Sequence, residues 1–167
     1  MSLVELIAQA DDRSLAAGGL ACLDRCLPLL GETDDEALRP LWSSLEAGGA
    51  GWADELTRLR ESYAGVDGDD EGAQLVRAML AAAPGEFPSG GLRAWAEACS
   101  SAALQVHRLL DATDDDGPLT AGELRRQTHI LDLLTTASGG LRQALVVSTE
   151  GRRVVRAVVS RRARVQG

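Results

Sequence analysis

The sequence predicts an all-α fold, a compact bundle of about seven or eight short, crossed helices. Apolar residues recur at helical spacing along the chain, and helix-capping signals precede several of these stretches. Glycine- and proline-rich breaks separate the stretches at short intervals. The length of 167 residues suits one domain, so residues 1–167 are predicted to form a single helical domain. A short α-solenoid is the alternative architecture, although no fixed repeat of about 30–45 residues is present.

Two helices are predicted within the first 31 residues. Ser2 and Glu5 have the spacing of a capping box, which predicts a short helix that ends near residue 10. A second helix follows, and residues at helical spacing give it one buried face: Leu15, Cys22, Cys26 and Leu30. Gly31 is placed to end this helix, and Pro28 is expected to distort its last turn.

Three helices are predicted in the middle of the chain. Thr33 and Glu36 form a second capping box, and Pro40 predicts a bent turn before a helix that ends near residue 47. The next helix follows a glycine-rich break and buries one face: Trp52, Leu56, Leu59 and Tyr63. The acidic stretch 65–72 is a loop, and the third helix then runs to the Pro84–Gly85 pair.

Three longer segments complete the chain. A helix is predicted over 91–110, and a second over 120–137 with an inward face made of Leu124, Leu131 and Leu134. The segment 141–165 is ambiguous, because its β-branched residues around Glu150 and Gly151 are also typical of a hairpin. We favour a helix, since its apolar residues fit a helical stripe and an isolated two-stranded hairpin is marginally stable.

Charge is unevenly distributed along the chain. All 17 basic residues are arginine, and seven of them lie in residues 139–167 beside one acid, which gives this segment a charge of +6. Residues 1–138 hold the other ten arginines and 24 acids, a charge of −14. An acidic body disfavours nucleic acid as a partner. The simplest partner for the basic segment is an acidic protein surface, that of this chain or of a second copy, so a homodimer is possible.

The sequence also favours a cytoplasmic location. The N-terminus has no basic region before an apolar stretch, so no secretory signal is expected, and no apolar run is long enough for a membrane span. The composition, without lysine or asparagine, fits a GC-rich and therefore bacterial coding sequence. Cys22, Cys26 and Cys99 are too few for a disulfide framework and are expected to be reduced and buried. A metal site joining them to His107 or His129 is the less favoured alternative.

The acidic loop at 112–123 resembles the EF-hand calcium loop. With Ala112 at position one, carboxylates or hydroxyls fall on later ligand positions of that loop: Asp114, Asp116, Thr120 and Glu123. Gly117 stands where the family has its glycine, but Ala112 provides no carboxylate at position one. The resemblance implies a weak calcium or magnesium site at Asp114, Asp116 and Glu123. The alternative is a capping box formed by Thr120 and Glu123, which needs no ion.

No catalytic motif stands out in this sequence. Nucleophile-elbow, P-loop, dinucleotide-binding and zinc-protease signatures are all missing, and no cofactor is implied. Sites that assemble only in three dimensions leave the question of an enzyme open, but the balance favours a non-catalytic role. We therefore expect a helical protein-interaction module of the adaptor, regulator or immunity type. The alternative function is a cation-linked helical switch that uses the loop at 112–123.

Overall fold

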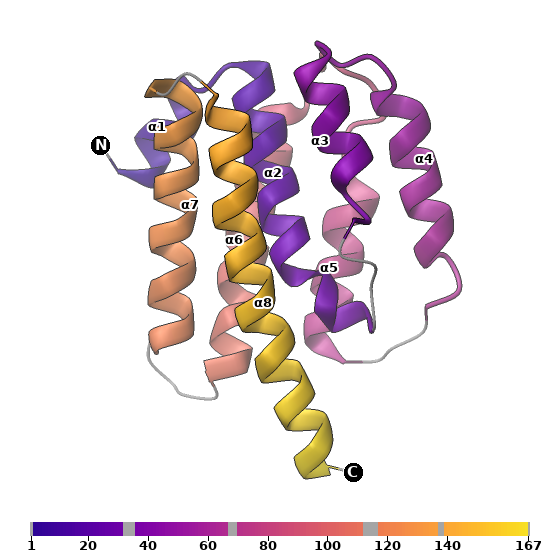
Figure 1. Cartoon of the computed structure of the whole chain (residues 1–167), viewed down its shortest axis with the longest axis vertical. Helices are drawn as coiled ribbons and strands as arrows, with labels where there is room; N and C mark the ends of the chain where they lie inside the picture. Colours follow the sequence, from indigo (N-terminus) through magenta and orange to yellow (C-terminus); the bar gives the residue numbers. More distant parts are fainter. Residues whose placement is uncertain (1, 32–35, 67–69, 112–116, 137–138, 167) are drawn as a thin grey trace.

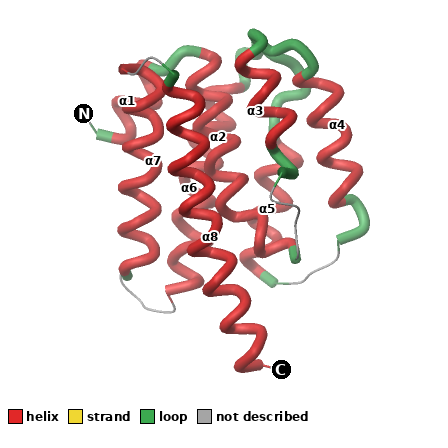
Figure 2. Tube along the Cα trace, in the orientation of Figure 1, coloured by secondary structure: helices red, strands yellow, loops and turns green. Residues whose placement is uncertain are grey.

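The computed structural model describes residues 2–31, 36–66, 70–111, 117–136 and 139–166. These residues form eight α-helices and one 3-10 helix, and none of them lies in a β-strand (Figure 2). The predicted all-α class and the predicted number of helices are therefore confirmed. No helix in the described ranges is both long enough and apolar enough to cross a lipid bilayer.

The first two helices begin at capping residues, and the second ends in a tighter turn. Helix α1 (Leu3–Gln9) begins with the capping box of Ser2 and Glu5, in which each side chain binds the other residue's backbone N–H. Asp11 caps α2 (Asp12–Cys26) by accepting the backbone N–H of Ser14. The end of the predicted second helix tightens into the 3-10 helix η1 (Leu27–Leu30), because Pro28 interrupts the α-helical hydrogen bonds.

Three short helices follow on one side of α2. Helix α3 (Arg39–Glu46) has Pro40 in its first turn, where a missing backbone N–H does no harm. Helix α4 (Trp52–Tyr63) buries the predicted Trp52, Leu56 and Leu59, whereas Tyr63 is only partly buried. Helix α5 (Glu71–Ala82) is capped by Asp70 and ends before Pro84. The predicted capping box at Thr33 lies outside the described residues.

The three longest helices make up the second half of the chain. They are α6 (Leu92–Asp111), α7 (Pro118–Thr136) and α8 (Gly140–Gln166). Helix α8 continues without a break through Glu150 and Gly151, so the hairpin alternative is wrong. Its buried face follows the predicted stripe over most of its length: Leu141, Ala144, Ser148 and Val155.

Helix α2 is the centre of the bundle. It packs against α6, α7 and α8, which come from the other end of the sequence, and also against α3 and α5 (Figure 1). In a solenoid each repeat contacts only its sequence neighbours, so these long-range contacts identify a crossed bundle. Helix α2 is buried on almost all sides, which explains why two adjacent charged residues, Asp24 and Arg25, lie inside the core.

Two side chains lie on unexpected sides of their helices. Leu124 was predicted to face inward, but 44% of it is exposed, and the buried face of α7 instead includes Glu123 and Gln127. Polar side chains occupy this face because they meet polar partners from α2 and α6. Arg152 belongs to the basic segment 139–167, yet it is 94% buried and paired with Asp24.

Candidate functional site

A fully buried ion pair joins α2 to α7. The Arg25 Nε–H donates to Glu123 Oε1 at 2.6 Å, and Arg25 Nη2 donates to Glu123 Oε2 at 2.6 Å. Both side chains are completely excluded from solvent. Burial opposes ionisation of Glu123, but the charge and hydrogen bonds of Arg25 outweigh it and hold the Glu123 pKa below its ordinary value. The pair therefore stays ionised inside an apolar core.

An amide and a hydroxyl extend this pair to α6. Gln127 Nε2 donates to Glu123 Oε2 at 2.8 Å and to the backbone carbonyl of Ser100 at 3.2 Å. The Ser100 hydroxyl in turn donates to Gln127 Oε1 at 2.5 Å. One buried polar network thus connects α2, α6 and α7, and each member fixes the rotamer of the next.

His107 lies against the same carboxylate from α6. Its Nδ1–H donates to the carbonyl of Ala103 at 2.6 Å, and its Nε2 is 3.6 Å from Glu123 Oε1. The Nε2 atom is buried and has no hydrogen-bond partner among the described residues. Burial lowers the His107 pKa, against the opposing pull of Glu123, so the ring is neutral at neutral pH.

The three cysteines lie close to this network as free, buried thiols, as the sequence predicted. Burial raises the pKa of Cys22 to about 12, and it also raises those of Cys26 and Cys99. The Cys22 sulfur accepts a long hydrogen bond from Arg25 Nη2 at 3.6 Å. The thiols are therefore protonated at neutral pH, a state with little nucleophilic or metal-binding character.

A second buried ion pair joins α2 to α8. Arg152 Nη1 donates to Asp24 Oδ1 at 2.5 Å, and the Ser148 hydroxyl donates to Asp24 Oδ2 at 2.9 Å. The burial of Asp24 raises its pKa despite these two partners. Gly151 of α8 lies against the stem of Arg25, and a side chain at this position would collide with it. A glycine within a long helix therefore allows α8 to cover the Arg25 pair.

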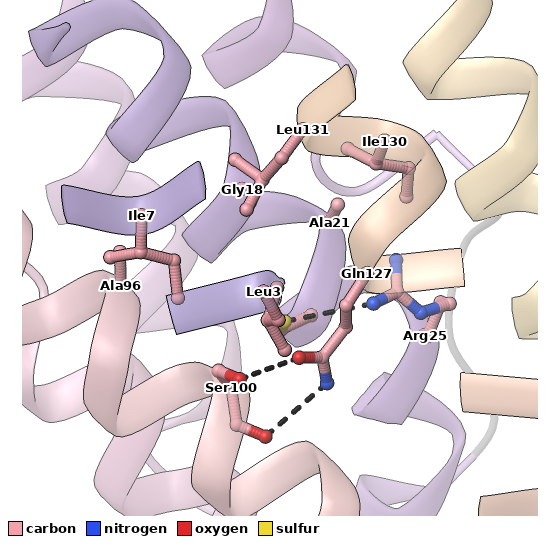
Figure 3. Close-up of a pocket in the computed structure, with 11 residues that line it drawn as sticks. Leu3, Ile7, Gly18, Ala21, Arg25, Ala96, Ser100, Gln127, Ile130 and Leu131 are labelled. Carbon is pink, nitrogen blue, oxygen red and sulfur yellow. Dashed lines mark hydrogen bonds between the residues drawn. The ribbon is translucent and has the colours of Figure 1, made fainter. Parts of the chain in front are cut away.

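A small cavity of about 20 Å³ lies beside Arg25, with room for about one water molecule. Its walls are mostly apolar and come from α1, α2, α6 and α7; Gln127 and Ser100 form its polar side (Figure 3). Figure 3 also shows the bonds that turn the Gln127 amide toward Ser100. The size of the cavity and its apolar lining suit a buried water molecule or an empty space rather than a substrate.

Glu123 takes no part in capping the first turn of α7. The carboxylate of Asp111 accepts the backbone N–H groups of Leu119 and Thr120, and it also accepts the Thr120 hydroxyl. These bonds outweigh the effect of burial and lower the Asp111 pKa. The first turn of α7 is thus capped by the last residue of α6. The interpretation of Thr120 and Glu123 as a capping box is wrong, because Glu123 turns into the core.

The predicted cation site is only partly described. Asp114 and Asp116 lie outside the described residues, and both oxygens of Glu123 accept hydrogen bonds from Arg25. A cation bound as predicted has to draw Glu123 away from that pair. Elsewhere in the described ranges, no three His, Cys, Asp or Glu side chains are grouped so as to hold a metal ion. His129, the other predicted candidate, is exposed on α7.

The cation hypothesis predicts a higher melting temperature in millimolar calcium, because a ligand that binds only the folded state stabilises it. The double substitution Asp114→Asn and Asp116→Asn is expected to abolish this rise without disturbing the core pair. The exposed Asp132 is the matched control, and its substitution by Asn is expected to leave the rise unchanged. Thermal melts with and without calcium measure the effect. A wild-type melting temperature that calcium leaves unchanged rejects the hypothesis.

Acidification is expected to destabilise the fold through His107. Its pKa is lowered in the folded state, so below a pH of about 6.5 the unfolded chain binds a proton that the folded chain does not. The free energy of unfolding then falls by up to about 1.4 kcal/mol per pH unit. This loss is expected to be absent from His107→Gln and retained in His129→Gln. Urea unfolding between pH 5 and 7 tests it, and equal pH profiles for the wild type and His107→Gln would contradict it.

No family model matches the chain, and neither the curated proteins nor the solved structures that were compared with it gave a match. The site is therefore interpreted from its own geometry. Sequence reasoning missed Arg25, Asp24 and Arg152 as buried partners. One signal pointed to the first two, since they are the only charged residues in the stretch 14–31.

Proposed function

We propose that this chain is a non-catalytic protein-interaction module that binds an acidic protein through the end of α8. The observation that carries the proposal is the position of that end. Helix α8 extends past the ends of α6 and α7, and residues 160–165 are all exposed (Figure 1). We define the basic end of α8 as Arg161, Arg162, Arg164 and Val165.

The basic end contacts the bundle through one arginine but remains open to a partner. Arg162 Nη2 donates to the carbonyls of Leu109 and Leu110 at the end of α6, at 3.0 and 3.4 Å. Within the described residues, Arg161 and Arg164 make no ion pair or hydrogen bond, and Val165 is 87% exposed. Two guanidinium groups and an apolar side chain on one helix end suit a carboxylate-bearing protein surface.

Charge favours protein over nucleic acid as the partner. The arginines of this end lie in a segment of +6, attached to a body of −14. That body repels phosphate within the Debye length of about 8 Å at physiological salt. The non-catalytic role has separate support from the core. There the acidic side chains are held by arginine, at Glu123 and Asp24, and the thiols are protonated.

The test is affinity capture from the source cell with two immobilised proteins, the wild type and the double variant Arg161→Glu and Arg164→Glu. The expected result is a protein that the wild type retains, that salt elutes and that the variant loses. Arg13→Glu with Arg58→Glu is the matched control, since both arginines are exposed and the change in net charge is the same. Loss of binding in this control as well, or retention only of nuclease-sensitive material, contradicts the proposal. So does turnover in a broad substrate screen without capture of any protein.

A second copy of the chain is one acidic protein of this kind, because its body carries the opposite charge. Sedimentation equilibrium of the purified wild type tests for this partner directly. A salt-sensitive dimer that is lost in the Arg161→Glu and Arg164→Glu variant identifies the second copy as the partner. If the wild type is a monomer at all concentrations, the proposed partner is a different acidic protein, which the capture experiment detects.

A further inference from the structure

A cleft of about 150 Å³ lies between α2, α3 and α8, away from the Arg25 network and from the basic end of α8. The buried ion pair of Asp24 and Arg152 lines it. Trp42 of α3 forms one wall, and Arg153 of α8 is exposed at its edge. The cleft thus combines buried polar groups with access from solvent.

Trp42 provides a hydrogen-bond donor that has no acceptor. The side chain is 96% buried, and its indole N–H has no partner among the described residues. The other two tryptophans differ in this respect. Trp52 Nε1 donates to the carbonyl of Pro84 at 2.9 Å, and Trp95 Nε1 donates to that of Met79 at 2.9 Å. A buried donor without a partner is energetically costly, so the Trp42 N–H favours any ligand that brings an acceptor.

Among the described residues that line the cleft, the charges leave one arginine in excess. Asp24 is neutralised by Arg152, and Glu36 forms an ion pair with Arg39. Arg153 makes no ion pair or hydrogen bond within the described part of the chain. The residues that line the cleft therefore have two unused groups, a cation and a buried N–H donor. Such a set complements an anion and repels a cation.

We propose that this cleft binds a small oxyanion, a phosphate or a carboxylate, with the Trp42 N–H and the Arg153 guanidinium as its donors. The volume is below the range of about 300–1,000 Å³ for sites that hold drug-sized molecules, which favours a small ion. The apolar side chains of Leu38 and Leu145 also line the cleft and lower the local polarity, which strengthens hydrogen bonds to a bound anion. This site does not depend on the proposed protein partner, because Arg161 and Arg164 lie outside it.

The indole N–H resonances of the three tryptophans give a direct test by two-dimensional ¹H–¹⁵N NMR. Inorganic phosphate and sodium acetate are titrated into the full-length protein, with sodium chloride at matched ionic strength as the control. The Trp42 resonance, assigned with Trp42→Phe, is expected to move saturably with phosphate, with acetate or with both. The resonances of Trp52 and Trp95 are expected to stay in place, because their N–H groups are already bonded to carbonyls.

The role of Arg153 is tested in the same titration. Arg153→Gln removes one charge-assisted hydrogen bond and is expected to weaken binding about tenfold or more. Arg161→Gln removes an equal charge from the same helix outside the cleft, and it is expected to leave the affinity unchanged. A response to phosphate alone identifies a phosphate site, and a response to acetate extends it to carboxylates. The proposal is overturned if neither anion moves the Trp42 resonance beyond the chloride control. Equal loss of affinity in the two arginine variants also overturns it.

Discussion

Substitution of Glu123 by leucine is expected to lower the free energy of unfolding by about 3–5 kcal/mol. The reason is that Arg25 would remain fully buried without its counter-charge, and Gln127 would lose the acceptor for one of its amide hydrogens. Urea unfolding followed by circular dichroism measures the effect. The matched control is Glu97→Leu, at an exposed position of α6, for which a change below about 0.5 kcal/mol is expected.

A double variant distinguishes loss of a partner from loss of packing. When Arg25→Met is added to Glu123→Leu, the unpaired charge disappears while the volume of the core is roughly kept. The double variant is therefore expected to be more stable than Glu123→Leu alone, since well-packed apolar residues often replace a buried ion pair without loss. If the two variants unfold at the same urea concentration, the cost arises from packing and the electrostatic explanation is wrong.

Removal of α8 by truncation after Ser138 is expected to abolish cooperative unfolding. The truncation uncovers the apolar face against which Leu141, Ala144 and Val155 pack, and burial of a large apolar side chain contributes about 1.5–3 kcal/mol. It also leaves the buried Asp24 without Arg152 and Ser148. The combined loss is comparable to the whole stability of a typical domain, about 5–15 kcal/mol. A thermal melt followed by circular dichroism provides the measurement.

A shorter truncation, after Ser160, is the control for this experiment. It removes residues 161–165, which are all exposed, together with the last two residues and the contact of Arg162 with the end of α6. The melting temperature is expected to fall by no more than a few degrees, while binding to the acidic partner is lost. If truncation after Ser138 also leaves the melting temperature nearly unchanged, α8 is an appendage rather than part of the core.

The helices were largely predictable because their signals are local. The capping box at Ser2, the prolines and the glycine breaks act on neighbouring backbone groups, and the structure places helix ends near them. For the last segment, the apolar stripe predicted the helix correctly, although the β-branched residues favoured a strand. Packing of α8 against α2 and α7 overrides the intrinsic preference of those residues. The prediction failed at Leu124, because the side of α7 that faces inward depends on polar partners that come from other helices.

The buried polar groups were not predictable in the same way. Arg25 and Glu123 are 98 residues apart, and nothing near either residue indicates that it meets the other. The same holds for Asp24 and Arg152, which are 128 residues apart. The cleft beside Trp42 depends on three helices from separate parts of the chain. Pairings of this kind follow from the packing of the bundle rather than from spacing along the sequence.

The buried cysteines allow the opening of the core to be measured by a chemical reaction. Cys22 and Cys26 of α2 and Cys99 of α6 are shielded from solvent, and burial raises the pKa of Cys22 to about 12. An alkylating reagent therefore reaches them only when the bundle opens. The rate of alkylation under native conditions then reports the population of opened molecules and hence the stability of the α2–α6 contact. The protein thus carries its own reactive groups for measuring core opening, which needs no denaturant and no engineered cysteine.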